Sequence, residues 1–152
     1  MSAEKVFSSA EMQLVTFNLG DESFGIDIMN VQEIIRIPTI TKVPRSPVYV
    51  DGVTNLRGHI LPVIDTRTKF AMEKVTMDGS TRVIVVDVNG KTVGLNVDSV
   101  SEVLRVEGKS IEQAPASLSE GVETSSITGV VKMNNGKKLV MILDVANLCS
   151  IE

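Results

Sequence analysis

The sequence predicts a mainly β fold of two five-stranded barrels packed side by side, with a few short helices. The first reason is a repeat: the segment 25–37, GIDIMNVQEIIRI, returns at 94–106 as GLNVDSVSEVLRV, with Gly, Val, Glu and Arg at matching positions. The second reason is that the apolar runs are short, rich in Val, Ile and Leu, and bounded by Gly, Asn or Asp, which is typical of strands. Closing each half into a barrel would remove its exposed strand edges.

The strands follow one another along the chain at fairly even spacing. Runs with the length and composition of strands occur at 12–19, 22–28, 53–57, 60–64, 82–88, 91–97, 102–107, 127–133 and 138–143. Two of the intervening turns, at Asn89-Gly90 and Asn135-Gly136, supply the positive φ angles that tight hairpins need. The register of these two hairpins is therefore well specified.

Helices should be few and short. A turn or two is expected at Met29–Ile35, where apolar residues recur at helical spacing. Asp65 and Asp144 each follow an apolar strand and occupy the position of an N-cap, so a short helix should follow each of them. Asp98 and Glu102 flank the second copy of the repeated segment with a spacing that would place both on one helix face.

Connections of different composition divide the chain. Prolines mark an extended link after the first copy of the repeat, its counterpart at 108–126 is rich in small polar residues, and 73–81 has the composition of a hinge. Terminal elements could exchange between the halves. The expected boundaries are 12–149 for the whole domain, 12–75 for the first barrel, 82–149 for the second and 1–10 for a disordered N-terminus.

Composition excludes several classes of protein. With 152 residues and 43% hydrophobic content, the chain can bury a good core as one unit or as two fused lobes. A net charge of -4 and 3% aromatic residues argue against nucleic-acid binding. No leader-like start and no apolar run near the roughly twenty residues that cross a bilayer are present, so we expect a cytoplasmic protein without membrane insertion. The single cysteine, Cys149, fits a reducing compartment.

Candidate catalytic groups are scarce. His59 is the only histidine, so a multi-histidine metal site is impossible and any catalytic triad would depend on this residue alone. Cys149 lies in an apolar segment and is expected to pack rather than react. Asp65 and Asp144 occupy equivalent places in the two repeats, which favours structural caps over an acid–base pair. We therefore expect no metal and no cofactor, and these residues offer no clear catalytic group.

The two copies of the repeat differ at one informative place. The run 49–65 contains an Asn-Leu-Arg-Gly turn, whereas the corresponding stretch 127–134 keeps the glycine and valine but lacks that turn. Arg57 within it presents a planar, permanently charged group that can pair with a carboxylate through two hydrogen bonds. Glu33, in the first copy of the repeat, is the candidate partner. A plain surface ion pair without a binding role is the alternative.

Several motifs in the same order resemble a known family. They are FGIDI at 24–28, VQEI at 31–34, VP at 43–44, YVDGVTNLRG at 49–58 and PVIDTR at 62–67, and with matching stretches in the second half they extend over about 12–149. Together they are similar to the bacterial chemotaxis coupling proteins of the CheW family. The resemblance implies two lobes, each a five-stranded SH3-like barrel, and a non-catalytic cytoplasmic scaffold. Such a scaffold joins the tip of a methyl-accepting chemoreceptor to the regulatory domain of the histidine kinase CheA, in arrays at the inner face of the membrane.

The resemblance also assigns roles to residues. In the family the receptor lies in the groove between the lobes, and the kinase docks mainly on one end of the first barrel. The positions implied for receptor binding or coupling are Val31, Glu33, Gly52, Asn55, Leu56, Arg57 and Gly58. The positions implied for kinase binding are Ile34, Ile35 and Ile37.

Two other functions remain open at this stage. One is a small-ligand-binding or enzymatic barrel that uses the groove between the lobes, with His59 and Asp65 as its polar groups. A deep enclosed pocket where those side chains converge would favour it, whereas a shallow, open, apolar groove would favour the adaptor. The other is a stand-alone relative of the kinase's regulatory domain that serves a different motility pathway.

Overall fold

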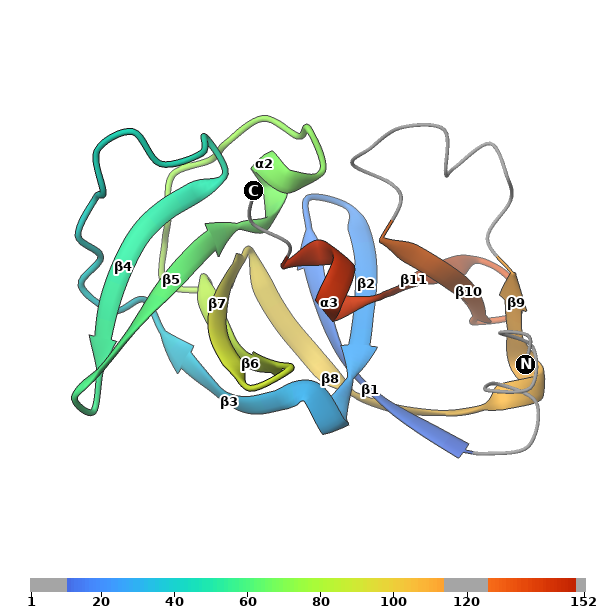
Figure 1. Cartoon of the computed structure of the whole chain (residues 1–152). Helices are drawn as coiled ribbons and strands as arrows, with labels where there is room; N and C mark the ends of the chain where they lie inside the picture. Colours follow the sequence, from blue (N-terminus) through green and yellow to red (C-terminus); the bar gives the residue numbers. More distant parts are fainter. Residues whose placement is uncertain (1–10, 114–125, 150–152) are drawn as a thin grey trace.

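The computed structural model describes residues 11–113 and 126–149 of the chain (Figure 1). The expected disorder of 1–10 lies outside the described residues. Within them the strands are β1 (Glu11–Leu19), β2 (Glu22–Asp27), β3 (Val31–Arg36), β4 (Val50–Leu56), β5 (His59–Asp65), β6 (Arg82–Val88), β7 (Lys91–Val97), β8 (Ser99–Glu107), β9 (Ile111–Gln113), β10 (Ile127–Met133) and β11 (Lys138–Leu143). The helices are single turns, namely η1 (Ile28–Asn30), α2 (Thr66–Lys69), η2 (Gly108–Ser110) and α3 (Val145–Leu148).

The strands form two mixed sheets that lie side by side. The six-stranded sheet has the order β8-β1-β2-β11-β10-β9, and the five-stranded sheet has the order β3-β6-β7-β5-β4. The prediction of a mainly β protein with two packed β units is confirmed. One of the units has six strands rather than five, because the short strand β9 adds to β10 at the edge.

The two sheets do not follow the expected halves 12–75 and 82–149. The six-stranded sheet combines the hairpin β1–β2 of the first repeat with β8 to β11 of the second, and the five-stranded sheet combines β3 to β5 of the first repeat with the hairpin β6–β7 of the second. The two repeats therefore exchange their first hairpins. Each exchanged hairpin joins its new sheet through a parallel strand pair: β2 pairs with β11, and β7 pairs with β5.

Each sheet curls toward closure. The edge strands of the five-stranded sheet, β3 and β4, are consecutive in the chain, and so are the edge strands β8 and β9 of the six-stranded sheet. Consecutive strands at opposite edges bring those edges toward one another, as in a small barrel. Figure 1 shows the two curved units beside each other, with α3 near the junction between them.

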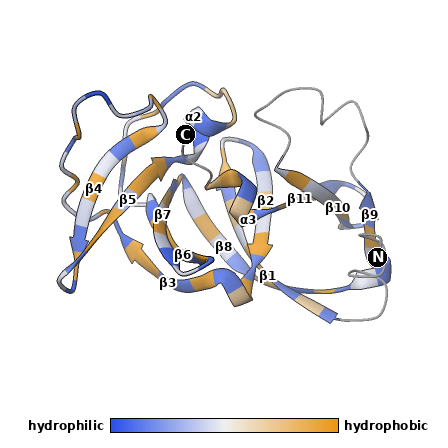
Figure 2. Ribbon diagram, in the orientation of Figure 1, coloured by the Kyte–Doolittle hydropathy of each residue, from blue (hydrophilic) through white to orange (hydrophobic). Residues whose placement is uncertain are grey.

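The largest hydrophobic cluster joins the two sheets. It holds Phe17 and Ile26 from the six-stranded sheet together with Ile64, Ile84 and Leu95 from the five-stranded sheet, all of them inaccessible to solvent. Two smaller clusters each belong to one sheet and fill its interior. Hydrophobic and hydrophilic residues alternate along the strands in Figure 2, as expected for strands with one buried face. The core is therefore shared rather than divided between two independent domains.

Three local predictions were wrong or incomplete. The segment expected to be helical at Met29–Ile35 is helical only in η1. From Val31 onward it is strand β3, which pairs with β6 and in which more buried and more exposed residues alternate. Strand β9 lies in the connection 108–126, where no strand was expected. Asp98 and Glu102 do not share a helix face, because β8 starts directly after Asp98.

The two predicted N-caps behave differently. The Asp144 carboxylate accepts a hydrogen bond from the Ala146 backbone N–H at 3.0 Å, as a cap should. The Asp65 carboxylate makes no such backbone bond and accepts instead from the Thr68 hydroxyl at 2.6 Å. Cys149 is buried in the shared core, which is consistent with a packing role.

Candidate functional site

The predicted ion pair forms at one end of the five-stranded sheet. The guanidinium of Arg57, in the turn between β4 and β5, donates two hydrogen bonds to the carboxylate of Glu33 on β3, one from Nη1 to Oε2 and one from Nη2 to Oε1 at 2.8 Å. The side chains are 69% and 25% exposed. Because β3 is one edge of the sheet and the β4–β5 hairpin forms the other, this pair links the two edges across the opening of the barrel.

The pair holds both groups in their charged forms. Hydrogen bonding from Arg57 lowers the pKa of the Glu33 carboxyl, and the same bonds raise the pKa of Arg57. A planar guanidinium held by two parallel bonds also has a fixed orientation. The site thus presents a rigid, charged feature whose remaining N–H groups face solvent.

The backbone of Arg57 adopts a conformation that few side chains choose. Its φ is +52° and that of Gly58 is +88°, and the Gly58 N–H donates to the Asn55 side-chain oxygen at 2.9 Å. The β6–β7 hairpin has nearly the same turn, with φ of +52° at Asn89 and +83° at Gly90. Asn is the preferred residue at that position, so an Arg there is retained against local preference. The turn itself therefore does not require an arginine.

Gly52 is placed inside the protein rather than on its surface. Its φ is +149°, and a Cβ added to it would lie 2.2 Å from the backbone oxygen of Thr41. Thr41 and Val53 exchange two backbone hydrogen bonds of 2.8 Å there, which tie the connection between β3 and β4 to strand β4. Gly52 is buried beneath this connection and offers little surface of its own to a partner.

The structure separates the predicted apolar residues into exposed and internal ones. Ile34 is 41% exposed on β3. Ile35 and Leu56 pack inward against the small cluster of the five-stranded sheet, and Val31 packs against the shared core. Ile37 follows the end of β3 and is half-buried. Ile34 is therefore the member of the predicted kinase-binding set that offers most surface to a partner.

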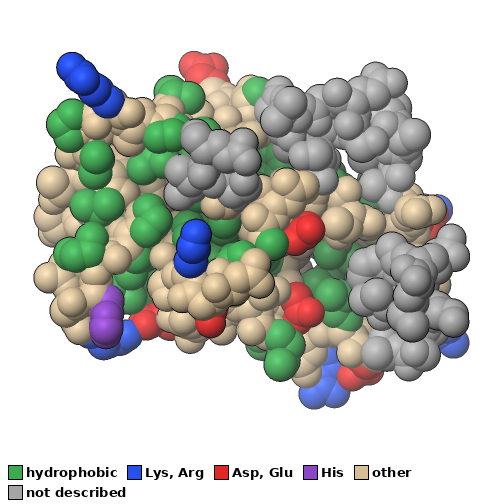
Figure 3. Space-filling model, in the orientation of Figure 1, with side chains coloured by type: hydrophobic (Ala, Val, Ile, Leu, Met, Phe, Trp, Pro, Cys, Tyr) green, Lys and Arg blue, Asp and Glu red, His purple; other side chains and the backbone are tan. Residues whose placement is uncertain are grey.

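Other exposed apolar residues were missed by the sequence analysis. Met29 in η1 and Ile60 in β5 are exposed, and so is Val48 in the connection before β4. In Figure 3, hydrophobic side chains gather over the part of the surface formed by β4, β5 and that connection. The alternation of β5, with Leu61 and Val63 buried, could have identified Ile60 as outward-facing.

The small-ligand alternative requires two groups that the structure keeps apart. His59 and Asp65 are the first and last residues of β5, so their Cα atoms are roughly 20 Å apart. His59 is exposed, whereas Asp65 is buried, and this burial raises the pKa of its carboxyl. An open groove of ≈ 760 Å³ lies along the connection before β4, and neither residue lines it. No shared ligand site can be built from His59 and Asp65.

The described residues show neither a metal cluster nor a membrane-spanning helix. Among residues 11–113 and 126–149, no group of three or more His, Cys, Asp or Glu side chains is arranged to hold a metal ion. None of the helices formed by these residues has the length and apolar character needed to cross a membrane.

Comparisons with known proteins agree with the geometry. Residues 13–152 match the model of the CheW-like domain. The chain is 39% identical over 140 residues to Chemotaxis protein CheW of Klebsiella aerogenes, covering 92% of this chain and 82% of that protein. It is 32% identical over 144 residues to the protein of the same name from Treponema pallidum, covering 92% and 83%. The crystal structure of the scaffolding protein TtCheW from Thermoanaerobacter tengcongensis superposes with a TM-score of 0.83 at 32% identity, covering 94% of this chain and 95% of that one.

Proposed function

The chain belongs to the CheW-like domain family, whose members are non-catalytic scaffolds of bacterial chemotaxis, and from this premise we propose how it couples its partners. It joins the cytoplasmic tip of a methyl-accepting chemoreceptor to the regulatory domain of the histidine kinase CheA. It works at the inner face of the membrane, where receptors recruit it into arrays. The end of the five-stranded sheet that carries Glu33 and Arg57 takes part in the coupling.

The observation that carries the proposal is the placement of Arg57. A left-handed turn position, where Asn would serve the fold better, instead holds an arginine oriented by a carboxylate on the neighbouring edge strand. Exposed aliphatic residues on β3 and β5, namely Ile34 and Ile60, supply apolar surface on the same sheet. A charged, oriented group beside apolar surface suits an amphipathic helical partner.

The test compares Arg57→Asn with a matched control. Asn satisfies the turn, so Arg57→Asn should fold with an unchanged or higher Tm while losing the ion pair. We expect it to lose co-sedimentation with a receptor cytoplasmic fragment and CheA, and to lose receptor control of kinase activity. Arg105→Asn is the control, because it removes an exposed ion pair, with Glu11, from the other sheet and should change neither result.

The outcomes separate two failures. If Arg57→Asn is folded and co-sediments like the wild type, the site is wrong and the pair is only a surface contact. If the wild-type protein itself fails to co-sediment with both receptor and kinase, the adaptor role with these partners is wrong. Glu33→Gln provides an independent check, since it removes the other half of the same pair.

A further inference from the structure

We infer that Arg67 and Asp98 form a lock that sets the angle between the two sheets at one of the two places where the chain passes between them. Within the described residues the chain crosses from one sheet to the other at η1, between β2 and β3, and again between β7 and β8. The second crossing consists of a single residue, Asp98, between Val97 and Ser99. Whatever holds Asp98 therefore adds to the shared core in fixing the orientation of the sheets at this crossing.

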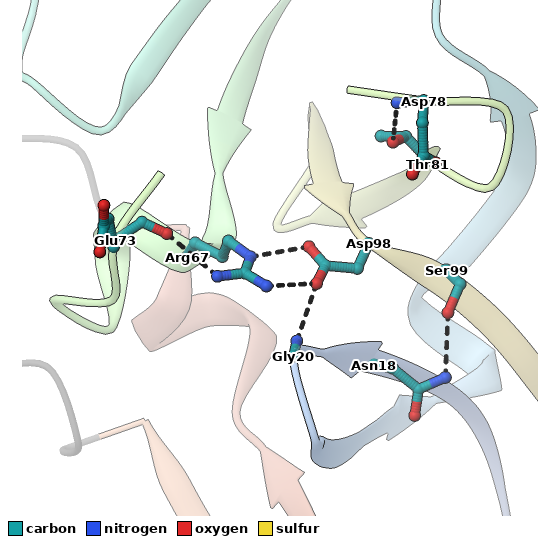
Figure 4. A network of polar contacts seen from close by, with 8 residues as sticks. All are labelled: Asn18, Gly20, Arg67, Glu73, Asp78, Thr81, Asp98 and Ser99. Carbon is teal, nitrogen blue, oxygen red and sulfur yellow. Dashed lines mark hydrogen bonds and ion pairs between the residues drawn. The ribbon is translucent and has the colours of Figure 1, made fainter. Parts of the chain in front are cut away.

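Asp98 is held from both sheets (Figure 4). From the side of the six-stranded sheet, the Gly20 N–H in the β1–β2 turn donates to Oδ2 at 2.7 Å, and the Asp98 N–H donates to the Asn18 carbonyl oxygen at 3.2 Å. From the side of the five-stranded sheet, Arg67 in α2 donates from Nε to Oδ1 at 2.8 Å and from Nη2 to Oδ2 at 2.6 Å. The carboxylate is the common acceptor that joins the two.

Arg67 is itself anchored. Its third nitrogen, Nη1, donates to the Glu73 carbonyl oxygen at 3.0 Å, so the guanidinium also ties down the segment that follows α2. The side chains of Arg67 and Asp98 are only 14% and 26% exposed. The ion pair of Arg105 with Glu11, in contrast, is 70% and 55% exposed. Partial burial and paired hydrogen bonds make the Arg67–Asp98 contact more rigid than such a surface pair.

The lock exists on one side only. When the two repeats are aligned by Gly25 and Gly94, the residue that corresponds to Asp98 is Met29. When they are aligned by Asp65 and Asp144, the residue that corresponds to Arg67 is Ala146. The equivalent crossing at η1 therefore lacks this charge pair, and Met29 is 85% exposed there. Movement of one sheet against the other would pivot at Asp98 and open or close at η1.

The unlocked crossing leads directly into the proposed binding site. Strand β3 begins at Val31, immediately after η1, and carries Glu33. A change of angle about Asp98 would therefore shift Glu33 and its partner Arg57 relative to the six-stranded sheet. Arg67 and Asp98 act as positioning residues for the end of the five-stranded sheet that carries Glu33 and Arg57. The positioning role rests on the proposed adaptor function, whereas the Arg67–Asp98 lock does not.

The lock is tested on the isolated protein by pulsed electron–electron spin resonance. Spin labels are placed at two exposed positions, Lys91→Cys in β7 and Lys138→Cys in β11, which lie in different sheets. Cys149 can remain, since burial raises the pKa of its thiol to about 12 and keeps it unreactive. We expect one narrow distance distribution for the parent protein, and a broader or shifted one for Asp98→Asn and Arg67→Gln.

Controls make the result decisive. Arg105→Gln, which breaks an exposed pair within one sheet, should leave the distribution unchanged. Arg67→Lys keeps the charge but loses the paired geometry, so it should broaden the distribution even if Arg67→Gln does not fold. Unchanged distributions in folded Asp98→Asn and Arg67→Lys would overturn the lock.

The link to coupling is read from binding. Folded Asp98→Asn should bind a receptor cytoplasmic fragment about fivefold or more weakly than the wild type. A broadened distribution with unchanged receptor affinity would overturn the positioning role and leave the lock standing. Failure of the wild type to bind the fragment would count against the adaptor proposal and not against the lock.

Discussion

Single residues in this protein act through the backbone as much as through their side chains. By resemblance, Gly52 was assigned to receptor binding or coupling. In the structure it lies under the connection before β4, and the Thr41 backbone oxygen occupies the space where a Cβ would lie. Arg57 does the reverse, since an unfavourable backbone conformation is kept so that its side chain can reach Glu33. A position can thus matter for binding either because it presents a group or because it lets another segment approach.

The first prediction concerns Gly52. Gly52→Ala should lower the free energy of unfolding by at least about 2 kcal/mol, because the new Cβ would overlap the Thr41 carbonyl and the φ of +149° disfavours a side chain. Urea denaturation at neutral pH measures the loss. Gly79→Ala is the control: nothing lies within 4 Å of an added Cβ there, so its effect should stay within about 0.5 kcal/mol. Equal effects of the two substitutions would contradict this explanation.

The second prediction concerns pH and Asp98. Hydrogen bonds from Arg67 hold the pKa of the Asp98 carboxyl below its usual value of 3.8, so the pair stabilises the fold above that pH and loses this contribution as the pH falls through the folded-state pKa. Asp98→Asn should cost about 1–3 kcal/mol at pH 7. The difference from wild type should shrink below pH 3.8. Urea midpoints measured from pH 7 to pH 2.5 check this, and a difference that is independent of pH would contradict it.

At the scale of elements, the β4–β5 and β6–β7 turns share one backbone geometry but not one sequence, whereas the β10–β11 connection is a longer loop, 134–137. Positive φ angles occur at Arg57-Gly58, at Asn89-Gly90 and around Asn135-Gly136. The tight turn at Asn89-Gly90 was predicted directly, because its turn chemistry is local, whereas the hairpin at Asn135-Gly136 was predicted in its place but closes through a longer loop. The Arg-Gly turn is the one that departs from that chemistry, and it is the one at the candidate site.

The third prediction exchanges these turn residues. Asn89→Arg should destabilise the protein by about 0.5–1.5 kcal/mol, because Arg tolerates the left-handed conformation less well than Asn. Asn89→Gly should be nearly neutral, since Gly adopts that conformation freely. Thermal denaturation distinguishes the two. If Asn89→Arg is as stable as wild type, the argument that Arg57 is retained for its side chain fails.

Elements that are specified by residues adjacent in the sequence were predicted well, whereas elements that depend on pairing with a strand distant in the sequence were not. Strand β3 has apolar residues at a spacing that also fits a helix, and only pairing with β6, about fifty residues later, decides between the two. The same limit applies to the site. The Glu33–Arg57 pair was predictable because the two repeats differ at Arg57, but the burial of Gly52 and the contact of Arg67 with Asp98 depend on how the chain returns on itself.

At the scale of the whole molecule, the exchange of hairpins could not be read from the sequence. The two repeats are alike, so β2 and β7 offer equivalent apolar patterns to β5 and β11. Pairing within a copy and pairing between copies satisfy the same pattern, and sequence alone gives no reason to prefer one. The fold class and the number of sheets follow from the apolar pattern of the sequence. The assignment of each hairpin to one sheet or the other does not.

The fourth prediction follows from the shared core. Because the largest hydrophobic cluster contains buried residues of both sheets, the described part of the chain should unfold in one cooperative step. Differential scanning calorimetry should show one transition with equal calorimetric and van't Hoff enthalpies, and a fragment ending at residue 78 should not fold alone. Two resolved transitions would mean that the sheets are independent domains.

The order of strands also bears on how the protein is made. Strands β3 to β7 are contiguous in the chain, so every strand of the five-stranded sheet has been synthesised before the six-stranded sheet is complete. The hairpin β1–β2 is synthesised first but must wait for β8 and β11, which at bacterial translation speeds emerge some five to twenty seconds later. During that interval its two unpaired edges are open to other nascent chains, which makes this hairpin the part of the described chain most in need of a chaperone.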